Sequence, residues 1–457
     1  MENIYELFDI IQDKNRIITE HIDEKYLSDS LGRLKGTASA VVFPISTEEV
    51  SEIMKWAYER EVPVTPRGAG TNLVGSTVPD HGGIVLDLTR MNRILELDYE
   101  TFTVTVEAGV ILQDFQRYIE EKGLFYPPDP GEKLATIGGN ISTNAGGMRA
   151  VKYGVTRDYV MGVEAVLPDG SIITVGSKNI KDSSGLSLKN LIIGSEGTLA
   201  VITKCILKLI PKPETSVSAV VPFSSLNSGI ECVLEIIKES ANPTAIEFVE
   251  KKVIKLGEDF LQIQFPYPEA KAYIILTFDG RKEEVESNLQ RVKEVVLKKQ
   301  ALDFIILNDR KLLEDVWKLR GVLVKAVEAE SEQEPVDIVV PINKTAEFIE
   351  FVNELEKDSG MQMVSFGHAG DGNVHLCVIR GNRTQEEWEE EKNRNLSVIY
   401  HKAYSLGGLT SGEHGIGLSK KKYFLEETDA LNVQLMRGIK EVFDQKKILN
   451  SHKSYNL

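Results

Sequence analysis

The sequence predicts an α+β protein made of two domains. At 457 residues, the chain is longer than one hydrophobic core normally organises. Its first half alternates short apolar strands, such as IVLDL and TVTVEAG, with the amphipathic helix LQDFQRYIEEKG. The sequence Ile210-Pro211-Lys212-Pro213 interrupts this pattern, because closely spaced prolines exclude a helix and a central strand. Beyond it, strands alternate with helices, which predicts an antiparallel sheet covered by helices.

Local signals define the elements of the first half in order. Ser46 and Glu49 form a capping box that opens a helix through Tyr58. The strand VPVTPRG follows, and the helix LQDFQRYIEEKG ends at Gly123. MGVEAVLPDGSIITVG predicts a hairpin with Pro-Asp-Gly as its turn. NLIIGSEGTLAVITK predicts a strand, a glycine turn and a second strand.

The second half contains the predicted strands AYIILTF, DFIILN and VDIVVP. Helices are expected around Val285–Lys299, Lys311–Ala329 and Thr345–Ser359. We therefore expect an N-terminal helical segment over residues 1–36, a first domain over 37–213 and a second over 214–457.

Composition excludes several classes of protein. The net charge of −16 argues against a general nucleic-acid binder, because no excess of basic residues is left to neutralise phosphates. Cys205, Cys232 and Cys377 are widely spaced and odd in number, which excludes a disulfide framework and indicates a reduced cytoplasm. The acidic N-terminus has no signal-peptide pattern, and no apolar run is long enough to span a bilayer. Any membrane contact is expected to be peripheral.

Three glycine-rich loops suggest a large phosphate-bearing ligand. PRGAGTNLVGS follows a strand, but the spacing of Gly68, Gly70 and Gly75 does not fit a Rossmann turn. The second loop spans Pro127–Asp158, and the third is the turn within Asn190–Lys204. Small residues let backbone amides approach a ligand closely and form anion-binding concavities. An ordinary surface turn is the alternative for any one of these loops.

Two of the seven histidines flank a tight turn in VSFGHAGDGNVHLCV. If Asp371 and Gly372 are its two central residues, His368 directly faces His375 on one side of a hairpin. Their imidazoles could then converge on one divalent ion. A longer turn would spoil this direct pairing, and histidines satisfied within the loop are the alternative.

A third ligand could come from SGEHGIG, the other cluster of histidine among glycines. Its Glu413 offers a carboxylate beside the imidazole of His414. Two histidines and one carboxylate leave coordination positions open, which is typical of a catalytic metal site.

Five motifs together resemble one known family. PRGAGT, PPDPG with ATIGGNISTNAGG, IGSEGTLAVIT, GHAGDGNVH and SGEHGIG occur in order between about residues 40 and 450. They resemble the FAD-linked oxidases of the vanillyl-alcohol-oxidase (PCMH) type, and within them the D-2-hydroxyacid dehydrogenases that oxidise lactate or glycolate. The resemblance implies a two-part FAD-binding domain over 37–213. It also implies a substrate-binding cap domain over 214–457, whose C-terminus returns to the flavin domain.

The resemblance assigns FAD contacts to residues of all three glycine loops. Ile202 could equally be a core residue, and Pro128 could only stiffen a turn. Because neither of the first two loops contains a histidine or cysteine, we expect noncovalent FAD. The implied contacts are Pro66, Arg67, Gly68, Ala69, Gly70, Thr71, Pro128, Asp129, Pro130, Thr136, Gly139, Asn140, Ser142, Thr143, Gly146, Glu196, Gly197 and Ile202.

The resemblance also implies a zinc, iron or similar divalent ion held by His368, His375 and Glu413. His414 is then available as the catalytic base that takes the hydroxyl proton of the substrate. Hydride transfer from C2 to flavin N5 would give a 2-oxo acid.

Substrate contacts follow from the same resemblance. Arg320 lies on a predicted amphipathic helix and suits a bidentate carboxylate contact, although a solvated surface arginine is the alternative. Asn373 is a further candidate polar contact. Relatives that oxidise dicarboxylates have a lysine where this chain has Pro335, next to Glu334. This departure favours a small monocarboxylate, D-lactate or glycolate.

The chain has no iron–sulfur or haem motif that could accept electrons from reduced FAD. Electron-transferring flavoprotein is therefore the leading expected partner, and a membrane quinone is the rival. Two other functions remain open: a metal-dependent hydrolase whose glycine loops bind a nucleotide, and a non-catalytic flavin-carrying subunit of a larger oxidase. The histidine motifs argue against the second.

Overall fold

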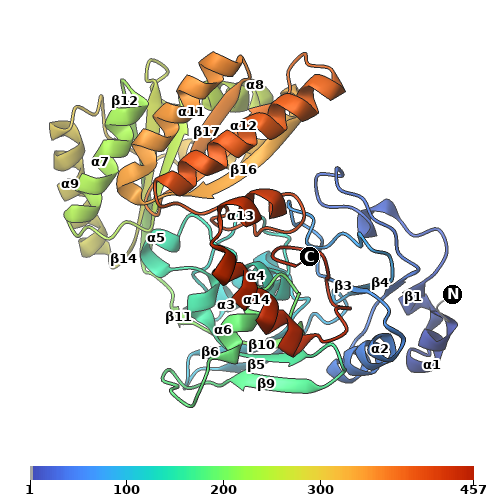
Figure 1. Ribbon diagram of the computed structural model, residues 1–457. Helices are drawn as coiled ribbons and strands as arrows, with labels where there is room; N and C mark the ends of the chain where they lie inside the picture. Colours follow the sequence, from blue (N-terminus) through green and yellow to red (C-terminus); the bar gives the residue numbers. More distant parts are fainter. Residues whose placement is uncertain (1–3, 457) are drawn as a thin grey trace. The chain divides into compact units, whose positions relative to one another are not determined.

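Two units make up the chain in the computed structural model, which describes residues 4–456 (Figure 1). The first unit comprises three segments, Met1–Gly146, Val155–Lys212 and Glu413–Leu457. The second unit comprises Gly147–Gly154 and Pro213–Gly412. Residues 1–3 and 457, at the ends of the expected N-terminal and C-terminal segments, lie outside the described residues.

The first unit begins with a small sheet that carries the first glycine loop. Its order is β1-β2-β4-β3, with β2, β4 and β3 parallel and β1 antiparallel at the edge. Helix α2 (Thr47–Arg60) connects β2 to β3, and the Ser46 hydroxyl caps it by accepting from the Glu49 N–H, as predicted. The reciprocal half of the predicted capping box differs, because the Glu49 carboxylate accepts from the Ile45 N–H rather than from the Ser46 N–H. The strand bounds are β1 (Ile17–Ile18), β2 (Ala40–Val42), β3 (Val64–Arg67) and β4 (Ile84–Asp87).

A second, antiparallel sheet of the first unit has the order β5-β6-β10-β8-β9. The predicted hairpin is confirmed, since β8 pairs with β9 from Gly162↔Gly176 to Val166↔Ile172. The strand bounds are β5 (Ile94–Asp98), β6 (Thr103–Glu107), β8 (Val160–Val166), β9 (Ile172–Gly176) and β10 (Val201–Lys208). A third sheet pairs β7 (Leu124–Phe125) with β11 (Ile210–Pro211).

Helices of the first unit correct two sequence predictions. The second glycine loop contains the short helix α4 (Ile137–Thr143), which begins where Thr136 caps the Gly139 N–H. The segment predicted as a strand before Gly194 is instead helix α6 (Leu188–Ile192). The remaining helices are α1 (Leu7–Ile10), α3 (Leu112–Glu121), α13 (Lys421–Glu427), α14 (Ala430–Phe443) and the 3-10 turns η1 (Ile4–Glu6), η2 (Lys14–Arg16), η3 (Glu24–Tyr26) and η4 (Thr156–Tyr159).

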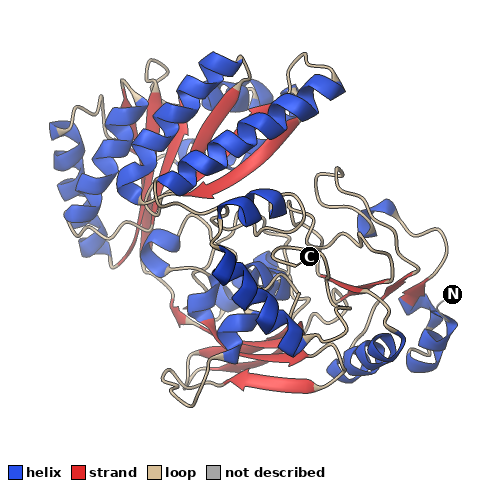
Figure 2. Ribbon diagram, in the orientation of Figure 1, coloured by secondary structure: helices blue, strands red, loops and turns tan. Residues whose placement is uncertain are grey.

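The second unit is built on one seven-stranded sheet, antiparallel throughout, as predicted (Figure 2). Its order is β15-β12-β14-β13-β17-β18-β16. The strand bounds are β12 (Thr215–Phe223), β13 (Ala245–Glu250), β14 (Ala272–Gly280), β15 (Ile305–Ile306), β16 (Gln333–Val339), β17 (Met363–His368) and β18 (Asn373–Ile379).

Helices cover this sheet and include the three predicted ones, α9, α10 and α11. One face of the sheet packs side chains such as Val249, Val364 and Cys377 against Val253 of α8 and Leu319 of α10. The helix bounds are α5 (Ala150–Tyr153), α7 (Leu226–Lys238), α8 (Lys251–Leu261), α9 (Lys282–Lys298), α10 (Arg310–Glu330), η5 (Ile342–Lys344), α11 (Thr345–Ser359) and α12 (Gln385–Ser405).

The three cysteine thiols are free and buried. Burial raises the pKa of Cys205, and it raises the pKa values of Cys232 and Cys377 to about 12. Because the thiolate is the reactive form, we expect the folded protein to resist a thiol-specific chromogenic reagent at pH 8, and all three thiols to react after denaturation. Rapid labelling of any thiol in the folded protein would contradict this expectation.

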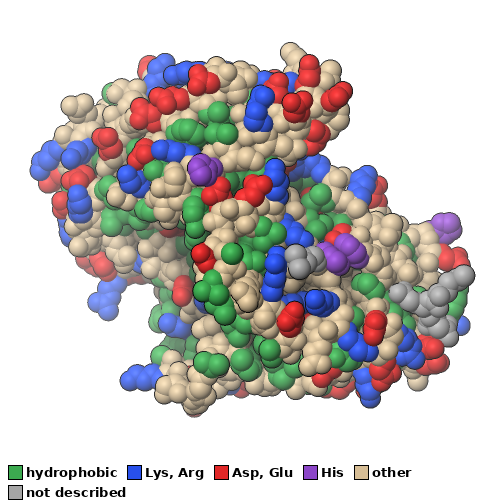
Figure 3. All heavy atoms as spheres, in the orientation of Figure 1, with side chains coloured by type: hydrophobic (Ala, Val, Ile, Leu, Met, Phe, Trp, Pro, Cys, Tyr) green, Lys and Arg blue, Asp and Glu red, His purple; other side chains and the backbone are tan. Residues whose placement is uncertain are grey.

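Acidic and basic side chains are interspersed over the face drawn in Figure 3. Within residues 4–456, none of the helices combines the length and the apolar character that crossing a bilayer requires.

Candidate functional site

The two turn-flanking histidines lie on adjacent strands, but not directly opposite each other. His368 ends β17 and pairs with Asn373, whereas His375 on β18 pairs with Phe366. The predicted register was therefore wrong by two residues, because the connection between the strands is longer than a two-residue turn. Since side chains alternate with a period of two, a shift of two leaves both histidines on the same face of the sheet, as diagonal neighbours.

The two imidazoles converge through their Nε2 atoms. His368 Nε2 lies 3.3 Å from His375 Nε2, and the ring planes are 87° apart. Two nitrogens that each bind one ion at about 2.05 Å in tetrahedral geometry are about 3.3 Å apart. Both residues are buried, with 7% and 9% of their surfaces exposed. The pair therefore has the spacing of two ligands of one metal ion.

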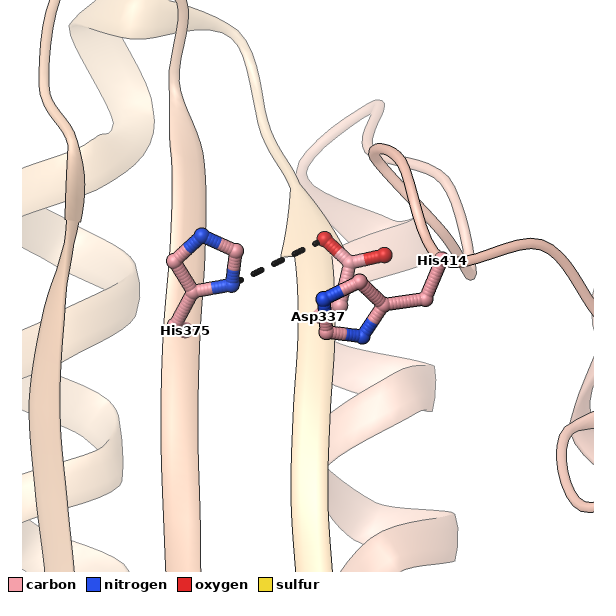
Figure 4. Close-up of side chains that lie close together, drawn as sticks. All are labelled: Asp337, His375 and His414. Carbon is pink, nitrogen blue, oxygen red and sulfur yellow. Dashed lines mark ion pairs between the residues drawn. The ribbon is translucent and has the colours of Figure 1, made fainter. Parts of the chain in front are cut away.

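Each imidazole has a carboxylate on its Nδ1 side. Glu247 Oε1 lies 2.6 Å from Nδ1 of His368, its direct cross-strand neighbour on β13. Asp337 Oδ1 lies 3.9 Å from Nδ1 of His375, its cross-strand neighbour on β16 (Figure 4). Metal-binding histidines commonly donate their second N–H to a carboxylate, which fixes the ring and the tautomer. The arrangement directs both Nε2 atoms to a shared point.

Arg320 on α10 contacts the same carboxylate rather than solvent. Its Nε and Nη2 donate to Glu247 Oε2 at 3.0 and 2.6 Å, and its guanidinium lies 5.0 Å from the Phe366 ring centre. Burial alone would raise the pKa of Glu247, but the charges of His368 and Arg320 outweigh it and hold this pKa below its usual value. Among the described residues, Nη1 of Arg320 donates no hydrogen bond, so this nitrogen is available to an anion.

The side-chain amide of Asn373 bonds to the Asp337 carboxylate and to a backbone carbonyl of β16. Its Nδ2 donates to Asp337 Oδ1 at 2.7 Å and to the Ile338 carbonyl at 3.0 Å. The other Asp337 oxygen accepts from the Ser411 hydroxyl at 2.8 Å and from the Gly412 N–H at 3.1 Å. Asp337 thus anchors the start of the SGEHGIG segment in the second unit.

Glu413 and His414 follow Gly412 directly and open the last segment of the first unit. A Cβ atom added at Gly146, a predicted flavin contact, would lie 2.9 Å from Glu413 Oε2. The Asn72 side chain of the first glycine loop donates to the His414 carbonyl at 3.3 Å. The predicted carboxylate ligand and base therefore lie beside the predicted flavin loops. His414, also labelled in Figure 4, comes from this segment.

The first two glycine loops pack against each other within the first unit. A Cβ atom at Gly68 would lie 2.2 Å from Thr136 Oγ1, so only glycine fits where the loops meet. The Arg67 side chain is buried and donates to Thr77 Oγ1 at 3.2 Å, which leaves the backbone after it, including the exposed Ala69, to face a ligand. The amide nitrogen of Asn140 is buried without a hydrogen-bond partner in the described structure.

These features fit a bound FAD. Buried polar groups are normally hydrogen-bonded, so the Asn140 amide indicates a missing acceptor in the α4 region. Backbone amides near Gly68 can approach a pyrophosphate closely. Other predicted contacts have protein partners: Gln116 donates to the Pro128 carbonyl at 3.0 Å, and Asp129 forms an ion pair with Lys133.

The other residues predicted to contact FAD differ in their surroundings. Ser142 and Thr143 hydroxyls donate to helix carbonyls of α4. Ile202 is buried in β10 and pairs with Ala165. Gly197 adopts a φ of +69° beside Pro66. The first two glycine loops also contain the predicted FAD contacts Gly70, Thr71, Pro130 and Gly139.

Glu247 and Asp337 were not predicted. Both are acidic residues inside otherwise apolar strand sequences, AIEFVE and VDIVV. A charged residue at a position expected to be buried is a signal of function, so this pattern could have revealed both.

Two family profiles match the chain. The profile described as FAD binding domain matches residues 38–176, and the one described as FAD linked oxidases, C-terminal domain, matches residues 212–454. The chain belongs to the FAD-linked oxidases. It is an FAD-dependent oxidoreductase.

Individual relatives support this family assignment. A D-lactate dehydrogenase of Anaerostipes hadrus is 43% identical over 98% of this chain and 96% of its own. The glycolate oxidase subunit GlcD of Bacillus subtilis is 38% identical over 94% of this chain and 92% of its own. A p-cresol methylhydroxylase structure with bound substrate superposes with a TM-score of 0.81 at 16% identity, covering 99% of this chain and 96% of that one. This last similarity concerns the fold alone.

Proposed function

We propose that this chain oxidises a small D-2-hydroxy acid, D-lactate in the first place and glycolate as the alternative, to the 2-oxo acid. The observation that carries the proposal is the convergence of His368 and His375 at 3.3 Å between Nε2 atoms. This donor pair suits a metal site that binds a hydroxyl and a carboxylate together. The names of the relatives at 43% and 38% identity support the same substrate class.

Noncovalent FAD is held by the glycine loops of the first unit in this proposal. When bound, FAD supplies the acceptor for the hydride that leaves C2 of the substrate. The chain contributes the packed backbone around Gly68 and Thr136 and the unpaired Asn140 amide. Neither of the first two loops contains a side chain that could form a covalent flavin link of the histidine or cysteine type.

The divalent ion, zinc or iron, is assigned to His368, His375 and Glu413. When bound, it supplies a Lewis acid for the substrate hydroxyl. Glu247 and Asp337 lie on the Nδ1 sides of the two imidazoles and orient the rings. Glu413 is proposed as the third ligand because it directly follows Gly412, whose N–H donates to the Asp337 carboxylate.

The chain's own residues bind the substrate and move its proton. His414 takes the hydroxyl proton on one imidazole nitrogen, the role of general base that histidine most often has. Arg320 offers Nη1 to the substrate carboxylate while Glu247 fixes the rest of the guanidinium. Asn373 can contact the substrate through Oδ1, because its Nδ2 already donates to Asp337 and to the Ile338 carbonyl.

A monocarboxylate is favoured by the edge strand β16. Pro335 stands where relatives that oxidise dicarboxylates have lysine, and the neighbouring Glu334 is acidic. A second substrate carboxylate would find no cation from either residue. Electrons are proposed to leave the flavin to electron-transferring flavoprotein, with a quinone as the rival acceptor. We place the protein in a reducing compartment such as the cytoplasm, with or without peripheral membrane contact. The three buried free thiols support this location.

Anaerobic mixing of the purified, FAD-loaded protein with D-lactate tests this function. We expect bleaching of the flavin absorption near 450 nm, with pyruvate formed one for one. L-lactate, glycolate and D-2-hydroxyglutarate are the comparison substrates, and the dicarboxylate should react slowest. A protein whose flavin stays oxidised with all of these acids would refute the substrate assignment, and one that never binds FAD would favour the hydrolase alternative.

A further inference from the structure

One buried carboxylate of the first unit joins four separate parts of the chain. Glu196, which is 6% exposed, accepts from the N–H groups of Ile416 and Gly417 at 2.9 Å each. The Ser454 hydroxyl donates to it at 2.7 Å, and the Ser76 hydroxyl also donates to it. The carboxylate therefore connects the first glycine loop, the third glycine loop, the SGEHGIG loop and the C-terminal tail.

The surrounding backbone is shaped to this carboxylate. Glu196 itself has a φ of +53°, a left-handed conformation that is unfavourable for residues with a Cβ. Gly415 has a φ of +86°, and a Cβ atom there would lie 2.9 Å from the carboxylate carbon. The Glu196 N–H donates to the Ser142 carbonyl of α4 at 2.7 Å. Strained positions that the surrounding structure holds in place are concentrated at functional sites.

The hydrogen bonds of Glu196 argue against the role expected from the sequence. Its two oxygens accept four hydrogen bonds from the protein, so the carboxylate is already fully hydrogen-bonded without any contact to FAD. Two of the donors are backbone amides that lie two and three residues after His414. A loop bonded at these amides cannot move His414 freely, because the chain between them contains only Gly415.

We propose that Glu196 is a positioning residue, whose carboxylate clamps the Ile416 and Gly417 amides and so holds His414 for proton removal. This inference rests on the proposed function of His414 as base. Glu196 does not touch substrate in this proposal, and it acts through the loop alone.

Glu196→Gln is the first test, because an amide nitrogen cannot accept a hydrogen bond from a backbone N–H. Hydrogen–deuterium exchange of the segment 411–418 in the FAD-loaded protein without substrate should become roughly 10- to 100-fold faster, as expected for a lost charge-assisted bond. In rapid mixing with D-lactate, flavin reduction should slow roughly 100-fold, while the KM stays within about threefold. FAD content should remain near one per chain.

Gly415→Ala perturbs the same contact from the loop side and guards against a folding defect specific to Glu196. It should give the same faster exchange and slower flavin reduction. Glu164→Gln is the matched control, since Glu164 accepts from Thr47 and Thr203 hydroxyls at 2.5 and 3.1 Å elsewhere in the same unit. The control should keep wild-type exchange in segment 411–418 and wild-type reduction.

The outcomes separate this inference from the proposed function. A wild-type flavin that no 2-hydroxy acid reduces would defeat the proposed function, while the exchange result would still report on the clamp. Unchanged exchange in Glu196→Gln would overturn the clamp. Loss of FAD in proportion to lost activity, with normal kinetics in the remaining holoenzyme, would also overturn it and return Glu196 to the role of a cofactor contact.

Discussion

His368→Ala should slow flavin reduction by D-lactate roughly 1000-fold or more while leaving FAD bound. The reason is that Lewis-acid stabilisation of the developing alkoxide is worth several kcal/mol, and each 1.4 kcal/mol changes a rate about tenfold. Alanine removes one of two nitrogens that lie 3.3 Å apart. Stopped-flow absorbance gives the rate, and elemental analysis gives the bound metal, which should fall with it. His375→Ala should behave in the same way.

His401→Ala is the matched control, because His401 is exposed on α12 of the same unit. This variant should retain metal, FAD and activity. Removing the ion from the wild-type protein with a chelator should reproduce the slow reduction, and adding back zinc or ferrous iron should reverse it and identify the metal. Loss of flavin from His368→Ala, with metal-independent activity in the wild type, would instead make the histidine structural.

Glu247→Gln should weaken metal binding and destabilise the second unit together. The carboxylate contacts both His368 Nδ1 and the Arg320 guanidinium, and it is fully buried. Loss of an outer carboxylate partner typically lowers metal affinity 10- to 100-fold. Leaving Arg320, whose side chain is 11% exposed, without its counter-ion should cost about 3 kcal/mol of unfolding free energy. Metal titration and urea unfolding measure the two effects separately.

Glu250→Gln provides the control on the same strand. Glu250 is buried and accepts from the Ser365 N–H at 2.9 Å and from Asn353 at 3.2 Å, and burial raises its pKa. Its replacement should leave metal affinity unchanged. Equal loss of metal affinity in both variants would mean that Glu247 acts only through general stability.

Local patterns were sufficient for most of the fold. The helix Thr345–Ser359, the hairpin β8–β9 and the antiparallel sheet all follow from periodicity and turn residues in short windows. Helix α4 was missed because its glycine, serine and asparagine content is typical of loops, and α6 was missed because its short apolar run was interpreted as a strand. Contacts with distant segments, such as the Gly194 N–H on the Ile141 carbonyl, stabilise them.

The site could be predicted only in part for a related reason. The histidines were found because they flank one turn, although the register depended on a turn length that the residues did not specify. Glu247 lies 121 residues before His368, and their contact exists only because β13 pairs with β17. The sequence similarly placed Glu196 near a ligand, but its bonds to Ile416 and Gly417 depend on long-range packing.

The interleaving of the two units along the chain has a consequence for biosynthesis. The chain passes between the units four times, and the first unit includes its last segment, Glu413–Leu457. The Val64 N–H at the base of the first glycine loop is bonded to the Ile448 carbonyl, and the Asn450 N–H to the Val64 carbonyl. A ribosome-bound nascent chain therefore cannot form these two hydrogen bonds until residues 448–450 have emerged. We therefore expect the base of the first glycine loop to be completed late in synthesis, whereas all strands of the second unit's sheet, the last of which ends at Ile379, have been made before then.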